Sequence, residues 1–251
     1  MNEDVRKKIV FFTGAGVSAE SGLPTFRGKE GLWEQLDVEK VATKKAWYSG
    51  RLHDCNDRRQ AVLDFINGMR RAILEHKPND AHKLIAGFEP DYDVTIITQN
   101  GDDYHEQAGS TRVIHLHGHV LYNASTLHPA ECWAIDRNSP DIKIGDKAAD
   151  GSQVRPYAVL FGEDIEMPIW KEARLAMQEA DICVVIGCSL LVYPAVDLLS
   201  ELNNEAFLYI VNLEEVKLPN DKNVIHAFKA AYYGLASEGM VWLKNQIKTI
   251  V

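Results

Sequence analysis

Three histidines alternate near the middle of the chain, in the segment His115-Leu116-His117-Gly118-His119. In a β-strand these three side chains would share one face, because successive residues point to opposite sides. Three imidazoles on one face could hold a metal ion, although no carboxylate or cysteine is paired with them locally. Alternatively, one of them acts as a general base, since the pKa of histidine lies near neutrality. Gly118 would then let a substrate approach closely.

A glycine-rich turn, Gly14-Ala15-Gly16, follows the apolar run 9–12 and precedes a stretch with helical character. Such a turn lets the backbone pass close to a pyrophosphate, and the next helix offers its free N–H groups to the anion. The spacing departs from GxGxxG because Ala19 stands where the third glycine would be. Many such turns are rich in glycine only for packing, so the turn alone leaves nucleotide binding open.

The next segment, 22–28, combines glycine and proline with Phe26 and Arg27. It could form a lid in which Arg27 reaches a phosphate with its planar guanidinium. It could equally be a solvent loop with Phe26 turned into the core, and composition alone favours that simpler interpretation.

Polar and small residues also follow three other apolar runs, in the segments 98–103, 187–190 and 212–214. The amides and carboxylates of 98–103 could hold a ribose, a carboxamide or a water, or they could cap a helix. In an open parallel sheet the carboxyl ends of the strands gather at one edge. With the glycine turn, four strand ends therefore converge, and this convergence is stronger evidence for a ligand site than any single motif.

The elements that must position these groups are short apolar runs separated by helical patterns. The runs are 9–12, 94–98, 182–186 and 206–211, and the helical patterns cover 61–75, 170–179 and 237–247. This alternation predicts an α/β fold with a doubly wound parallel sheet and helices on both faces. The helix-rich region 29–81 and the irregular region 119–159 interrupt it, which indicates a smaller inserted unit or a long functional loop.

Composition narrows the function classes. Of 251 residues, 46% are hydrophobic and 25% charged, as in ordinary globular proteins. A net charge of −9 argues against broad binding to nucleic acid or to an anionic membrane. No apolar run approaches the roughly 18 residues of a membrane span, and the N-terminus lacks the pattern of a signal peptide. We therefore expect a cytoplasmic protein.

The four cysteines form no CxxC pair, which argues against a disulfide framework and against a four-cysteine zinc site. They are Cys55, Cys132, Cys183 and Cys188. Two of them lie in or beside an apolar run, where buried free thiols are expected.

Taken together, several motifs closely resemble those of the sirtuins, a family of NAD-dependent protein lysine deacylases. The motifs are the segments 14–28, 98–100, 117–118, 155–156 with 161–163, and 192–195, and they occur in the family's order. The resemblance extends from about residue 9 to about residue 242 and implies a Rossmann-like domain with a small inserted domain. It assigns 1–28, 82–118 and 160–251 to the NAD-binding domain, and 29–81 and 119–159 to the small domain.

The resemblance also implies the roles of individual residues. The NAD site would comprise Gly14, Ala15, Gly16, Ala19, Glu20, Thr25, Phe26, Arg27, Trp33, Gln99, Asn100, Asp102, Gly187, Cys188, Ser189, Asn212, Leu213, Glu214 and Ala236. His117 would remove a proton from a ribose hydroxyl, and Asn100 would order the ribose or a water. Asp102 would hold the nicotinamide carboxamide, and Phe26 would shield the reaction from water.

An acyl-lysine protein or peptide is the implied partner, and it would enter the cleft opposite NAD. It would add as a strand between two segments, with the acyl group beside an apolar pair. The residues expected to contact it are Phe161, Gly162, Glu163, Val192, Tyr193, Ile66 and Met69.

Three departures from the family's pattern carry further expectations. The stretch 121–126 lacks the cysteine pair of most sirtuins, and the region 141–156 resembles the zinc-free variant of some bacterial members, so we expect no metal. Gly101 replaces the usual isoleucine, which would open space beside the nicotinamide pocket and loosen the turn. Ile66 and Met69 stand where sirtuins that prefer acidic acyl groups have tyrosine and arginine, while Arg70 would point elsewhere.

The predicted function is therefore NAD-dependent removal of acetyl or longer apolar acyl groups from protein lysines, giving nicotinamide and O-acyl-ADP-ribose. Two alternatives remain. One is mono-ADP-ribosyl transfer or NAD glycohydrolysis, which the change at Gly101 makes conceivable. The other is a catalytically quiet NAD-binding module, which would need neither Asn100 nor His117.

Overall fold

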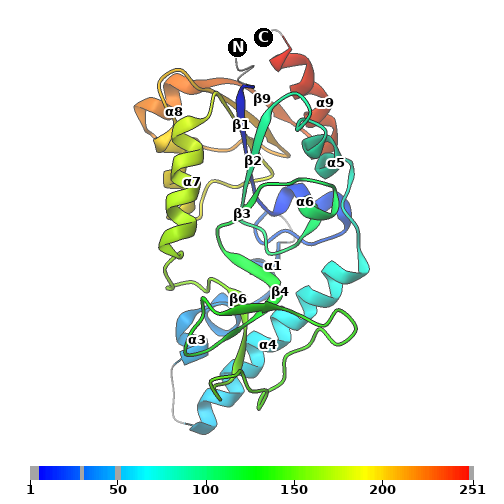
Figure 1. Cartoon of the computed structure of the whole chain (residues 1–251), viewed down its shortest axis with the longest axis vertical. Coiled ribbons are helices and arrows are strands. Elements are labelled where there is room, and N and C mark those ends of the chain that lie inside the picture. Colours follow the sequence, from blue (N-terminus) through cyan, green and yellow to red (C-terminus); the bar gives the residue numbers. More distant parts are fainter. Residues whose placement is uncertain (1–5, 29–30, 49–51, 249–251) are drawn as a thin grey trace, which may run out of the picture.

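The computed structural model describes residues 6–28, 31–48 and 52–248. In Figure 1 a large sheet with its helices forms the upper part of the molecule, and α4 with a small sheet forms the lower part. Both described ends of the chain lie at the top of this view, far from the small sheet. The side chain of Cys55 lies outside the described residues, and the other three cysteines are free thiols.

The large sheet has six parallel strands in the order β3-β2-β1-β7-β8-β9. The strands are β1 (Lys8–Thr13), β2 (Asp93–Thr98), β3 (Val113–His115), β7 (Ile182–Ile186), β8 (Phe207–Asn212) and β9 (Phe228–Tyr233). The chain builds outward from β1 to β3 and then returns to the other side of β1 with β7. The strand order therefore reverses between β1 and β7, and ligands bind at such switch points. This confirms the predicted doubly wound sheet.

Helices cover both faces of this sheet, because its strands alternate between two apolar cores. Val10 and Phe12 pack in one core, whereas Ile9 and Phe11 pack in the other. The first core is covered by α7 (Met167–Glu179), η2 (Ala195–Glu201) and α8 (Lys222–Ala227), and the second by α5 (Asp80–Ala86) and α9 (Ala236–Ile247). In Figure 1 α7 and α8 lie to the left of the strands, and α5 and α9 lie to the right.

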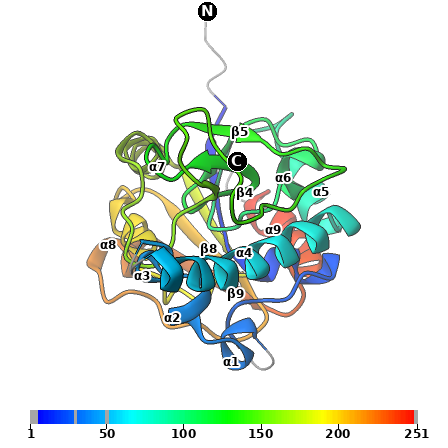
Figure 2. The same ribbon diagram turned by 90° about the horizontal axis from the view of Figure 1, so that it is seen from below.

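The lower part combines a long helix with a small antiparallel sheet of order β5-β4-β6. Its elements are α1 (Leu32–Gln35), α2 (Val38–Val41), α3 (Lys44–Tyr48), α4 (Leu52–Glu75), β4 (Gly118–Ser125), β5 (Cys132–Ala134) and β6 (Val154–Ala158). Figure 2, the view from below, shows α4 crossing in front of the large sheet, with β4 and β5 of the small sheet to one side of it. The region 119–159 thus contains a sheet as well as loops.

Arg70 fastens α4 to this small sheet. Its guanidinium is fully buried and donates to the backbone carbonyls of Val120, Tyr122 and Pro140 at 2.6–2.8 Å. A buried cation that satisfies its donors with carbonyl oxygens holds those strands at a fixed distance from the helix. Arg70 therefore points away from the neighbouring Met69, as predicted.

No helix in the described part of the chain is long and apolar enough to cross a membrane.

Candidate active site

A cavity of about 610 Å³ lies at the carboxyl ends of the strands, between the large sheet and the small part. Its volume falls within the range of roughly 300–1,000 Å³ that is typical of ligand sites. The wall includes all the predicted cofactor-binding, catalytic and substrate-binding residues except Asp102. Segments that are far apart in the sequence thus meet around one space, as the convergence of strand ends predicted.

Glycines bring the ends of β1 and β7 together. The backbone N–H of Gly14 donates to the Ile186 carbonyl at 3.0 Å, and that of Gly16 donates to the Gly187 carbonyl at 2.9 Å. A Cβ on Gly16 would lie 2.6 Å from the Gly187 Cα, and one on Gly187 would lie 2.3 Å from the Val17 nitrogen. Any side chain here would separate the two turns. The glycines therefore have a definite packing role, and the turn continues as a 3-10 helix, η1 (Ala15–Ser21), not an α-helix.

Asn100 and Asp102 share the hydroxyl of Ser18. The Asn100 amide donates to the Gly14 carbonyl and to the Ser18 Oγ, each at 3.3 Å. The Ser18 hydroxyl in turn donates to Asp102 at 3.0 Å, and the Tyr104 N–H donates to the same carboxylate at 3.2 Å. Neither Ser18 nor Asp102 belongs to the described cavity wall, so contact of Asp102 with a ligand stays a prediction. Burial raises the pKa of Asp102 to about 6, and hydrogen bonds from Tyr104 and Ser18 partly oppose the rise.

His117 faces the cavity, and its surroundings suit a general base. Burial lowers its pKa below the ordinary histidine value, and a hydrogen bond with the Gln99 backbone opposes part of that shift. The ring is therefore neutral at pH 7 and can accept a proton.

The expectation that three imidazoles share one face is wrong. β3 ends at His115 and β4 begins at Gly118, so the chain turns at His117 instead of continuing as one strand. His115 and His119 approach each other outside the cavity wall, and His115 pairs with Glu106 on α6 (Tyr104–Gln107). The sequence gives no local signal for Glu106, because it stands nine positions before His115 and on a separate helix.

The expectation of open space at Gly101 is also wrong. A Cβ at this position would lie 2.7 Å from the Val120 Cγ1, so the Val120 side chain already fills the place of the missing one. The Val120 N–H also donates to the Gly101 carbonyl at 3.0 Å, which fastens the turn to β4. The glycine therefore allows a close approach of β4 and does not leave a gap.

One end of the cavity is aromatic. Phe26 stacks on Trp33 with ring centres 5.1 Å apart, and Trp33 contacts Phe65 and Phe161 at 5.6 and 6.1 Å. Phe26 thus lies in the cavity wall and not in a separate core. Phe65 was missed from the sequence, although its place beside Ile66 on a helical pattern could have indicated it. Ile66 is only 4% exposed and contributes both to this wall and to the core of the small part.

Arg27 is exposed at the same wall, and no residue in the described ranges forms an ion pair with it. A guanidinium in this position is available to an anion.

The predicted peptide-binding segments lie on the rim, but their groups differ in availability. The Glu163 carboxylate is occupied by Arg155, whose two N–H groups donate to it at 2.6 and 2.9 Å, and by the Leu160 N–H at 2.8 Å. The Phe161 backbone pairs with residues Ala42 and Lys44 at 2.8 and 2.9 Å. Glu163 is therefore a structural residue of the rim.

Hydrogen bonds also fix the segment that follows β8 and the start of α9, both of which line the cavity. The Asn212 amide donates to the Glu214 carbonyl at 2.8 Å. Glu20 accepts hydrogen bonds from both the N–H and the hydroxyl of Ser237, at 2.9 and 2.6 Å. The first turn of α9, which contains Ala236, is thereby held against η1.

Comparison with known proteins agrees with this geometry. Residues 14–194 match the Sir2 family. NAD-dependent protein deacylases from Helicobacter pylori and Bacteroides thetaiotaomicron are 41% and 40% identical, over 89% and 95% of this chain and 93% and 97% of theirs. A Sir2 homologue mutant in complex with ADP-ribose has a TM-score of 0.80 and 30% identity, over 98% of this chain and 93% of that one. A Sir2 complex with a deacetylated p53 peptide and 3′-O-acetyl-ADP-ribose gives a TM-score of 0.78 at 28% identity, over 98% and 94%. The chain therefore belongs to the Sir2 family.

Proposed function

We propose that this protein uses NAD to remove acyl groups from protein lysines, releasing nicotinamide and O-acyl-ADP-ribose. The observation that carries the proposal is the shared cavity: a neutral His117 and a buried Asn100 border the same space as the glycine turn at the switch point. The relatives from Helicobacter pylori and Bacteroides thetaiotaomicron bear the name NAD-dependent protein deacylase.

The cavity fits a dinucleotide. Its β1 turn and the Gly187 turn expose backbone at the reversal of strand order, where dinucleotides bind in doubly wound folds. Arg27, which forms no ion pair with any residue that the structure describes, offers a cation for the pyrophosphate, and Asn212 and Glu214 line the part beyond β8. NAD would supply the ribosyl carbon to which the acyl oxygen becomes bonded as nicotinamide leaves.

The residues of this chain would then move one proton and exclude water. His117 accepts the proton of a ribose hydroxyl through its neutral imidazole, a role worth roughly 10²–10⁴-fold in rate. Asn100 orients the ribose or a water from a position fixed by Gly14 and Ser18. The stacked rings of Phe26 and Trp33 form an apolar wall that keeps bulk water from the reacting groups.

The peptide would add as a strand at Gly162. The outward backbone of Phe161 is already paired with the segment after α2, whereas no described residue hydrogen-bonds the N–H or carbonyl of Gly162. Val192 and Tyr193 lie on the same rim, and Tyr193 is 65% exposed, as a residue that contacts a partner would be. Backbone pairing of this kind gives affinity with little dependence on sequence.

An apolar acyl group is the expected substrate, because Phe65, Ile66 and Met69 face the cavity from α4. A succinyl carboxylate would lose its hydration there without a cation to pair with it. The double substitution Ile66→Tyr and Met69→Arg should lower activity on an acetyl peptide and raise it on a succinyl peptide. Equal activity of the native chain on both peptides would contradict this assignment.

We also propose that the small part folds without a structural zinc ion. Hydrogen bonds between side chains cross-link its loops. The Ser125 hydroxyl donates to Asp150 and lies 3.0 Å from the Ser152 hydroxyl. Gln153 joins three further backbone groups, those of Gly145, Lys143 and Val154, at 2.7–3.0 Å. Treatment with EDTA should leave the fold and the deacylase activity intact, whereas loss of both would reject this proposal.

The three apolar cores support the proposed domain boundaries in outline, although Tyr104 and Leu160 of the large domain pack in the core of the small one. The large sheet would comprise 1–28, 82–118 and 160–251, and the small domain 29–81 and 119–159. The boundary at 81 needs a small shift, because Ala81 packs in the core beneath α9 and α5 begins at Asp80. Limited proteolysis should cut near residue 79 before it cuts within α5.

A cytoplasmic location is proposed as well, supported by the free thiols of the three described cysteines and testable by cell fractionation.

One assay tests the activity against its two alternatives. The protein is incubated with NAD and an acetyl-lysine peptide, and the products are analysed by mass spectrometry. Free lysine with O-acetyl-ADP-ribose supports deacylation. ADP-ribosylated protein, or ADP-ribose formed without an acyl acceptor, would instead indicate ADP-ribosyl transfer or NAD hydrolysis. NAD that is bound but unchanged would indicate a catalytically quiet NAD-binding module. The variant His117→Ala should lose acyl removal while NAD affinity stays within several-fold.

A further inference from the structure

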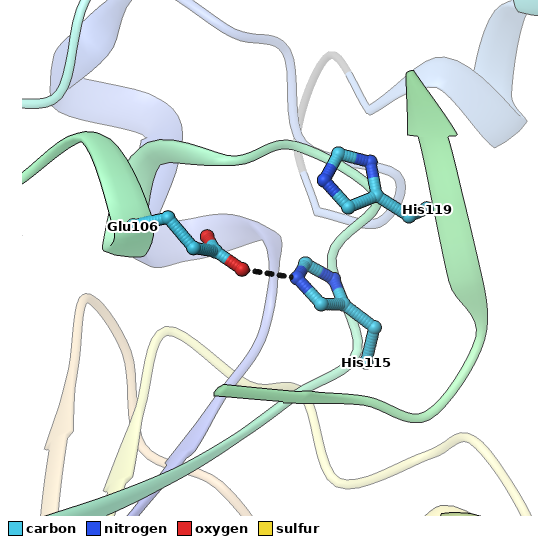
Figure 3. A group of neighbouring side chains, drawn as sticks. All are labelled: Glu106, His115 and His119. Carbon is cyan, nitrogen blue, oxygen red and sulfur yellow. Dashed lines mark hydrogen bonds and ion pairs between the residues drawn. The ribbon is translucent and has the colours of Figure 1, made fainter. Parts of the chain in front are cut away.

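Glu106, His115 and His119 form a cluster outside the active-site cavity. Figure 3 shows the two imidazoles turned toward the Glu106 carboxylate, from the end of β3 and the start of β4. Potential ligand atoms of the three side chains all lie within 4.8 Å of one another. The His115 Nε2 is 2.8 Å from the Glu106 Oε1. None of the three belongs to the described wall of the active-site cavity.

We propose that this cluster binds a divalent transition-metal ion through two imidazoles and one carboxylate. Imidazole nitrogens and a carboxylate oxygen are suited to first-row metals of this kind. Ligand atoms bonded at about 2.0–2.2 Å stand roughly 3 Å apart around a metal. The separation of His115 and Glu106, 2.8 Å, is already close to this value, and the ligand atom of His119 lies within 4.8 Å of both.

The second shell of His115 is that of a metal ligand. Its Nδ1 lies 3.0 Å from the Asn100 carbonyl and can only donate to it, and its Nε2 faces the Glu106 carboxylate. The proton that Nε2 and Glu106 share is the one that a bound cation would displace to solvent. A ligating histidine commonly donates its other N–H to a backbone carbonyl, which fixes the tautomer and the orientation of the ring.

His119 supplies the second imidazole nitrogen of the cluster. Its Nδ1 accepts only one long bond, from the Leu121 N–H at 3.3 Å. No described residue hydrogen-bonds its Nε2. Arg137, a nearby cation, is paired with the Asp103 carboxylate.

The site is accessible from solvent. A cavity of about 240 Å³ adjoins both imidazoles and is also lined by Tyr122, Cys132 and Glu172. It gives a cation a route to the cluster and leaves room for water molecules to complete the coordination. Because His115 donates to the Asn100 carbonyl, a bound cation would be one hydrogen bond away from the backbone of a predicted catalytic residue. The inference itself does not depend on the proposed deacylase activity.

The test uses the full chain without a metal-binding tag, treated with EDTA and then titrated with Co²⁺ or Ni²⁺ by calorimetry. We expect one cation per chain, a change in the visible spectrum of Co²⁺, and a rise in melting temperature. Glu106→Gln and His119→Gln should each weaken metal binding by at least about 10–100-fold. This is the loss typical of a residue that only supports a ligand, so loss of a ligand itself should cost no less. His226→Gln is the matched control, because His226 is exposed on α8.

Several results would overturn the proposal: no binding to the native chain, unchanged affinity in both cluster variants, or an equal loss in His226→Gln. Loss of binding in Cys132→Ser with full binding in His119→Gln would assign the cation to the thiol instead. Circular dichroism identifies a variant that fails to fold, and the other cluster variant then decides. None of these readouts requires NAD or turnover, so failure here is distinguishable from failure of the proposed function.

Discussion

Asp102 makes the stability of this protein depend on pH in a calculable way. Its carboxyl group is 5% exposed, and burial raises its pKa from 3.8 to about 6. Between these two values the unfolded chain releases the proton while the folded chain retains it. The folded state therefore becomes less stable as pH rises through this window. At 1.36 kcal/mol per pKa unit, the full effect is about 3 kcal/mol, of which about 2 kcal/mol falls between about pH 4.5 and 7.5.

The substitution Asp102→Asn removes this titration and keeps an oxygen that can accept the Tyr104 N–H. The free energy of unfolding of the variant, relative to the native chain, should therefore rise by about 2 kcal/mol from about pH 4.5 to 7.5. Urea unfolding across this range measures it, with Asp57→Asn as a control because Asp57 is exposed on α4. A constant difference between Asp102→Asn and the native chain would refute the reasoning, as would a similar trend in the control.

Three further predictions concern other contacts of the site. Gly101→Ala should lower the free energy of unfolding by about 1–3 kcal/mol, because the new methyl group overpacks against Val120. Adding Val120→Ala should recover part of this loss, as measured by urea unfolding. If the effects of the two substitutions simply added in the double variant, the contact would be contradicted. Glu163→Gln should cost about 3 kcal/mol in the same assay, because it leaves the buried guanidinium of Arg155 without its anion, and a cost below about 1 kcal/mol would argue against that ion pair. The acid limb of kcat/KM should have its midpoint below the ordinary histidine value of about 6.5, because burial lowers the pKa of His117. A midpoint above that value would remove His117 as the titrating base.

The two turns around Gly16 and Gly187 show why function and packing are difficult to separate in a motif of this kind. Their contact needs both glycines, since a Cβ on either would lie within 2.6 Å of the other turn. The same contact brings the two strand ends together and exposes backbone at the switch point. A glycine chosen for packing therefore also creates the place where a phosphate group can approach the main chain.

The central strands and the main helices were determined by local sequence. The runs in β1, β2, β7 and β8 are short, apolar and β-branched, and they appear where the pattern predicted them. Their interior positions are buried on both faces, which is why a continuous apolar run sufficed as a signal. The edge strands β3 and β9 escaped prediction because β3 has three residues and β9 is mostly half-exposed or exposed.

The site was predictable as a set of residues but not as a set of contacts. Strand ends in a parallel sheet meet by geometry, so the sequence alone brought Gly14, Asn100 and Gly187 to one edge. Only the tertiary structure showed that Val120 fills the space at Gly101, because that contact joins two regions with no local signal between them.

The three histidines show most clearly what the sequence determines and what only the tertiary structure decides. Their alternation predicts a shared face only if the strand continues, and whether it continues depends on the chain turning between two different sheets at His117. That turn sends His117 into the cavity and leaves His115 and His119 beside Glu106. The sequence determined which side chains are present and where the strands end, whereas long-range packing decided which of these side chains face one another.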